Sequence, residues 1–131
     1  MTPETGDFLR KASQCLANSD AILAIPIPDV AAREAYLAGY HAAEAFIFAH
    51  TGKTVKTHKG LRSEFARLTR SDPSLREFSG FLARAYELKS IADYGVDPEI
   101  HVSVEDAGTA RDIARRFILD VTMRLAAPRT R

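Results

Sequence analysis

Six alanines recur at alternating steps of four and three, at positions 31, 35, 38, 42, 45 and 49. In a helix, this spacing places all six along one narrow stripe of the surface. A stripe of methyl groups lets a second helix approach closely, at the short end of the usual ~8–10 Å between helix axes. The stripe therefore predicts a central helix over residues 31–49, with the other helices packed round it.

Four further segments carry apolar residues at helical spacing. They are residues 1–20, residues 57–68, residues 74–91 and residues 103–125. No stretch alternates apolar and polar residues for long enough to predict a strand. Joined by short connections, the five helices predict an all-α fold, an up-and-down antiparallel bundle of four or five helices.

Polar residues and a glycine mark the expected helix ends. Asp29, Thr57 and Ser74 are expected N-caps, because their side chains can accept hydrogen bonds from the first free amides of a helix. Ser103 is expected to cap the last helix in the same way. Gly52 suits a left-handed position directly after the central helix.

The length and composition fit one globular domain. The chain has 131 residues, of which 46% are hydrophobic and 27% are charged. This is enough for one core and too little for two. We therefore expect a single helical domain over residues 1–131, with fraying at residues 1–5 and 128–131. The formal charge of +1 lacks the basic excess of a dedicated nucleic-acid-binding protein.

Residue usage also argues against several classes of site and location. The single cysteine, Cys15, cannot form an intramolecular disulfide or a cysteine-based metal cluster. The four histidines include no pair at the spacing of helical zinc ligands, so we expect neither a metal nor a cofactor. No signal peptide and no apolar run near the ~18 residues of a membrane span is present. We expect a cytoplasmic protein without membrane association.

Two histidines lie in contexts that suggest chemistry. His41 and Glu44 lie one turn apart on the central helix, where they can hydrogen-bond to each other or to a backbone group, or serve a ligand or catalytic role. His58 lies at a helix start between Lys56 and Lys59. Free amides and the positive end of the helix dipole favour an anion there, which predicts a phosphate-binding site. The alternative is that His58 packs over its own helix while the two lysines face water.

Three segments follow one another in the order AYLAGYHAAEAFI, KTHKGLRSEF and YELKSIADYG. Together they resemble the HEPN superfamily, and most closely its small bacterial stand-alone proteins. The resemblance extends over roughly residues 8–125. It implies a helical bundle that is commonly homodimeric and often encoded beside a minimal nucleotidyltransferase as a toxin–antitoxin pair. It also implies RNA as substrate, since active members cut RNA without a metal.

The superfamily's ribonuclease signature is R-x4-6-H, and this chain departs from it. Lys89 stands where the arginine is usual, and no histidine follows at the required distance. We therefore hypothesise a rearranged catalytic set, in which folding brings His58, His41 or His101 to Lys89 as general base, Lys89 is the phosphate clamp and Tyr94 is a positioning donor. The remaining residues of the implied binding groove are Lys56, Lys59 and Asp93.

Two functions remain open. The first is an RNA- or nucleotide-binding protein, in its catalytic form a metal-independent endoribonuclease, and the polar residues of KTHKG and ADYG favour it. The second is a non-catalytic interaction module that dimerises and docks on a nucleotidyltransferase, which the missing signature favours. Asp93 also has a structural interpretation, in which it either holds a backbone amide or pairs with Lys89 one turn earlier.

Overall fold

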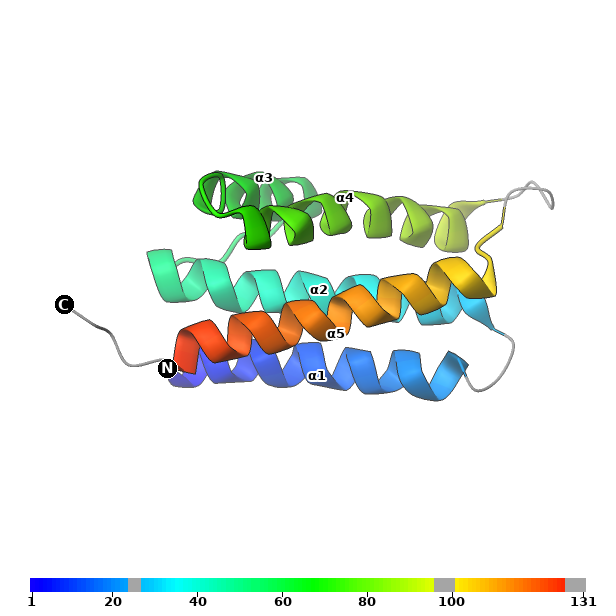
Figure 1. Cartoon of the computed structure of the whole chain (residues 1–131), viewed down its shortest axis with the longest axis horizontal. Coiled ribbons are helices and arrows are strands. Elements are labelled where there is room, and N and C mark those ends of the chain that lie inside the picture. The colour runs from blue at the N-terminus through cyan, green and yellow to red at the C-terminus, as the bar shows by residue number, and fades with distance from the viewer. Residues whose placement is uncertain (24–26, 96–100, 127–131) are drawn as a thin grey trace.

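The computed structural model describes residues 1–23, 27–95 and 101–126, which form five helices and no strand. Figure 1 shows α1, α2, α4 and α5 running alternately in opposite directions along the long axis, with the shorter α3 beside α4. The all-α antiparallel bundle predicted from the sequence is confirmed. The helices are α1 (Pro3–Leu23), α2 (Pro28–Thr51), α3 (His58–Leu68), α4 (Pro73–Tyr94) and α5 (Val104–Ala126).

The central position of α2 follows from its small residues. Among the described helices, α2 alone contacts all four others. In Figure 1 it lies between a layer of α3 and α4 and a layer of α1 and α5. Five of the six stripe alanines, at positions 31, 35, 38, 42 and 45, are fully buried, and Ala49 is partly buried. The predicted seam is therefore confirmed.

Gly39 permits a close approach of α4 to α2. A Cβ atom at position 39 would lie 2.6 Å from Cε2 of Phe81, too close for the two atoms to coexist. Phe81 itself is only 2% exposed, so its ring has little room to move aside. A glycine inside a helix costs about 0.5–1 kcal/mol relative to alanine. The packing of the Phe81 ring against the α2 backbone offsets this cost.

Three of the predicted caps are confirmed. Gly52 follows α2 in the left-handed conformation, with a φ of 71°. The Thr57 side chain accepts a hydrogen bond from the Gly60 amide at 2.9 Å. The Ser103 side chain accepts one from the Asp106 amide at 3.0 Å.

Two predicted caps are wrong, and a proline is the cause in both cases. The N-cap of α2 is Ile27, without a side-chain hydrogen bond, and Asp29 lies inside the first turn. The N-cap of α4 is Asp72, which accepts hydrogen bonds from the Ser74 and Leu75 amides. Pro28 and Pro73 take the first helical position, which suits their fixed φ and missing N–H. Each helix therefore starts earlier than expected.

The chain ends can be compared with the fraying expected there. Within residues 1–5, α1 already begins at Pro3, and the Thr5 side chain is 1% exposed. The Thr5 amide donates to Oγ1 of Thr2 at 3.2 Å. Residues 128–131 lie outside the described residues. None of the helices in the described ranges has both the length and the apolarity needed to cross a membrane.

Candidate functional site

Three helices meet at a group of side chains that we call the His58 cluster. Each helix contributes two residues spaced by one turn, so that both lie on the same helix face. The members are Tyr36 and Tyr40 of α2, His58 and Arg62 of α3, and Tyr86 and Lys89 of α4.

The imidazole of His58 is surrounded by tyrosine rings. Its centroid lies 5.6 Å from the ring of Tyr36, 5.0 Å from that of Tyr40 and 5.5 Å from that of Tyr86. A hydrogen bond of 2.7 Å joins its Nδ1 to the hydroxyl of Tyr36. Because Tyr36 is fully buried, this bond and the three rings fix the position of the imidazole.

Arg62 brings a charge with an unpaired donor into the cluster. Its guanidinium carbon lies 4.3 Å from the centroid of the Tyr86 ring, in cation–π contact. Its Nη1 atom is buried and has no hydrogen-bond partner in the described part of the chain. Leaving a buried N–H unpaired costs free energy, so such a group in a native structure calls for an explanation.

The cluster favours uncharged forms of its histidine and its buried tyrosine. Burial lowers the pKa of His58 below its ordinary value, and the charges of Lys89 and Arg62 lower it further. Burial raises the pKa of Tyr36 to about 12, although Arg62 opposes part of this rise. Near neutral pH, an uncharged imidazole therefore faces two cations. Lys89 of α4 therefore acts electrostatically on His58 of α3.

Lys89 also belongs to a short chain of ion pairs. Its Nζ lies 2.5 Å from Oδ2 of Asp93, and Nη1 of Arg33 lies 3.6 Å from Oδ1 of the same carboxylate. The hydrogen bond from Lys89 is the main cause that lowers the pKa of Asp93. The alternative in which Asp93 pairs with Lys89 is thus confirmed. Two cations, Lys89 and Arg33, thus share the carboxylate of Asp93, which leaves a positive excess for an anion.

The structure brings some of the predicted site residues together and separates others. Lys89 pairs with Asp93, and the charge of Lys89 acts on His58. His41 instead bonds to Glu44 at 2.5 Å, as one of its two interpretations expects. The remaining three residues, Tyr94, Lys56 and Lys59, have exposed side chains. No cluster of acidic, histidine or cysteine residues that could hold a metal occurs within residues 1–23, 27–95 and 101–126.

Four members of the cluster were not predicted as site residues from the sequence: Arg62, Tyr36, Tyr40 and Tyr86. One signal for Arg62 was present, since it follows His58 by four residues and so lies on the same face of α3. Tyr36 directly follows Ala35 of the alanine stripe, so the spacing gives its place on α2. Its hydrogen bond to another helix could not be read from that spacing.

Comparison with known proteins agrees with the three sequence motifs. A family model described as the HEPN domain matches residues 5–124. No curated protein matches the chain. The matched range includes every member of the His58 cluster and both partners of Lys89 in the ion-pair chain.

Proposed function

The chain belongs to the HEPN family, and on this basis we propose that it binds RNA or a nucleotide phosphate at the His58 cluster. Family membership favours a role related to nucleotides or RNA. The cluster supplies the cations that such a ligand needs for its phosphate oxygens, Arg62 of α3 and Lys89 of α4. The positive excess around Asp93 supports the same ligand class.

The unpartnered Nη1 of Arg62 is the observation that carries this proposal. A phosphate oxygen would supply the missing acceptor, and the planar guanidinium is well suited to phosphate. Stacking on Tyr86 holds the guanidinium in place before a ligand arrives. Lys89 provides a second cation near His58, which allows two groups to act on one anion.

We propose binding as the primary function because the ribonuclease signature is incomplete. Lys89 replaces the usual arginine on α4, and the histidine near it comes from another helix, α3. Metal-independent endoribonuclease activity of toxin–antitoxin type is the catalytic form of the proposal. Cleavage of RNA in the presence of excess chelator would support that form.

The deciding experiment compares Arg62→Met with Arg67→Met. Both substitutions keep a long apolar stem and remove one charge from α3, but Arg67 is exposed and already pairs with Glu64. We expect Arg62→Met to weaken binding of a labelled single-stranded RNA, measured by fluorescence anisotropy, by roughly tenfold or more, since hydrogen bonds to charged groups contribute ~1.5–3 kcal/mol. The RNA affinity of the control, Arg67→Met, should stay within about twofold of the wild-type value. Equal affinity for wild type and Arg62→Met would exclude Arg62 from the site.

A second candidate function, as an interaction module, is favoured by an apolar patch on α5. Leu119 and Met123 are 59% and 65% exposed, and charged residues of α5 flank them. Exposed apolar groups rimmed by charges are typical of protein-binding surfaces. HEPN domains commonly dimerise, so we propose a homodimer here, with a minimal nucleotidyltransferase as the other partner class.

Light scattering tests the interaction surface. Leu119→Asp should convert a dimer into a monomer at micromolar concentration, because a buried unpaired charge disfavours association. Asp112→Asn, an exposed change elsewhere on α5, should leave the dimer intact. A wild-type protein that is monomeric at these concentrations would argue against this function and leave the RNA-binding proposal standing.

A further inference from the structure

The hydrogen bond between Tyr36 and His58 can have two directions, and the surroundings distinguish them. Tyr36 is fully buried, so its hydroxyl must find its partners within the protein. The positive charge of Arg62 acts on this hydroxyl. A guanidinium can only donate hydrogen bonds, so Arg62 cannot accept the phenolic proton. The phenolic proton is then left for Nδ1 of His58, 2.7 Å away.

The reverse direction would leave a buried proton without an acceptor. If Nδ1 of His58 donated to Tyr36, the phenolic O–H would have to point elsewhere. Among the hydrogen bonds of the described residues, the Tyr36 hydroxyl bonds only to His58. The two cations nearby, Arg62 and Lys89, can only donate. A buried O–H without a partner is unfavourable, so the reverse direction is disfavoured.

The doubly protonated imidazole is disfavoured for a separate reason. It would add a third positive charge next to Arg62 and Lys89 in a partly buried site. The neutral form with its proton on Nε2 is then the one left. In the described ranges of the chain, Nε2 has no hydrogen-bond partner, so this N–H remains free for a ligand.

We propose that Tyr36 is a positioning residue that donates to Nδ1 of His58, so that neutral His58 presents an N–H donor at Nε2 to an oxygen of a bound phosphate. This assigns His58 the role of an anion-binding donor beside Arg62. It differs from the general base implied by the family resemblance, because a protonated Nε2 cannot accept a proton. The ligand in this inference rests on the proposed function, whereas the tautomer does not.

Nitrogen NMR of the histidine-labelled, ligand-free protein tests the tautomer directly. Protonated and unprotonated imidazole nitrogens have separate ¹⁵N shifts. Near pH 7.5 we expect Nδ1 of His58 to be unprotonated and Nε2 to be protonated. A protonated Nδ1 would overturn the inference. The wild-type spectrum alone decides this point, so the test does not depend on the folding of any variant.

Two tyrosine variants then separate positioning from packing. Tyr36→Phe keeps the ring and removes the hydroxyl, so we expect His58 to shift toward a mixture of tautomers. Tyr40→Phe, whose ring also lies beside His58 but without a hydrogen bond to it, should keep the wild-type tautomer. An unchanged tautomer in folded Tyr36→Phe would overturn the role of Tyr36.

Titration with inorganic phosphate tests whether the Nε2 donor of His58 binds an anion. Titration should move the Nε2 signal of wild-type His58, and Tyr36→Phe should require a severalfold higher phosphate concentration for the same change. No movement of the signal would overturn the donor role of His58. If RNA fails to bind while the expected tautomer is observed, the proposed function alone is wrong. If RNA binds while Nδ1 carries the proton, this inference alone is wrong.

Discussion

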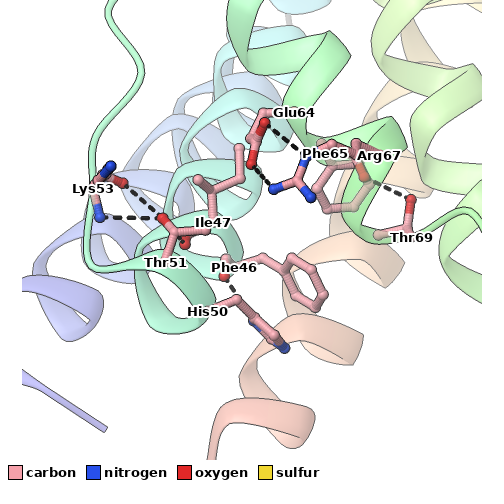
Figure 2. A network of polar contacts seen from close by, with 9 residues as sticks. All are labelled: Phe46, Ile47, His50, Thr51, Lys53, Glu64, Phe65, Arg67 and Thr69. Atoms are coloured by element: carbon pink, nitrogen blue, oxygen red, sulfur yellow. Dashed lines mark hydrogen bonds and ion pairs between the residues drawn. The ribbon is translucent and has the colours of Figure 1, made fainter.

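Two polar regions of this bundle contrast in how far their hydrogen bonds reach along the chain. Figure 2 shows the region where α2 and α3 end. There the His50 ring bonds to the Phe46 carbonyl, and the hydroxyls of Thr51 and Thr69 donate to carbonyls four residues earlier. Arg67 pairs with Glu64, three residues away. Every one of these contacts stays within a single helical turn or its cap.

The His58 cluster joins residues that are far apart in the sequence. Its central hydrogen bond spans 22 residues, from Tyr36 to His58, and one of its donors has no partner. Local polar contacts satisfy the orphan groups of helix ends, which is a structural task. A contact between helices that leaves a buried charged donor without an acceptor does not serve that structural task, so it requires a different explanation. This contrast supports our proposal that the cluster is the candidate site.

The largest effect is expected from Gly39→Ala, which alters the α2–α4 contact beside the cluster without changing a polar group. The added methyl would overlap the Phe81 ring, and overpacking of this kind costs ~1–3 kcal/mol of unfolding free energy. Gly108→Ala, inside α5 with nothing within 4 Å of its Cβ, should instead stabilise by about 0.5–1 kcal/mol. Urea unfolding measures both. Equal midpoints would mean that α4 does not depend on Gly39.

Thr69→Val should come next, with an effect on stability alone. Thr69 is fully buried and its hydroxyl donates to the Phe65 carbonyl at 2.8 Å, so its loss should cost about 1 kcal/mol. Thr109→Val, an exposed change on α5, should alter the free energy of unfolding by no more than ~0.5 kcal/mol. RNA affinity should not change in either variant. A weaker affinity in Thr69→Val would remove the functional distinction between the two regions.

Asp93→Asn should strengthen anion binding. Asp93 competes with a ligand for Lys89 and Arg33, so its neutralisation should raise RNA affinity by about two- to fivefold, since partly exposed pairs contribute up to ~1 kcal/mol. Asp112→Asn, next to Arg111 on α5, controls for the change in net charge. Titration at constant ionic strength measures the effect. If RNA affinity increases equally in both variants, the increase comes from the change in net charge and not from the release of Lys89.

The smallest effect is a pH dependence of stability. The pKa of His58 is lower in the folded protein than in the unfolded chain, so the unfolded chain binds the extra proton first as the pH falls. Stability should therefore decline below about pH 6.5, with a slope of at most ~1.4 kcal/mol per pH unit. Urea unfolding of His58→Gln between pH 7.5 and 5.5 should show a shallower decline. Parallel curves would contradict the lowered pKa.

The sequence predicted what depends on periodicity and missed what depends on contact between helices. The alanine stripe was enough to predict α2, and the residue types at Thr57 and Gly52 were enough to predict the caps there. The cap at Ser74 failed because Pro73 started α4 earlier. Motif resemblance led to His58 and Lys89, but no pattern along the chain could indicate that Tyr36 and Arg62 would meet them.

Gly39 has a mechanical consequence for the site, although it touches no ligand group. It lies between Tyr36 and Tyr40 on α2, and Phe81, which packs on it, precedes Tyr86 and Lys89 on α4. Because a helix of this length is stiff, the distance between α2 and α4 at this contact affects the distance between the cluster residues that these two helices contribute. A side chain at position 39 would increase that distance. The spacing of the candidate site therefore depends on a residue that carries no functional group.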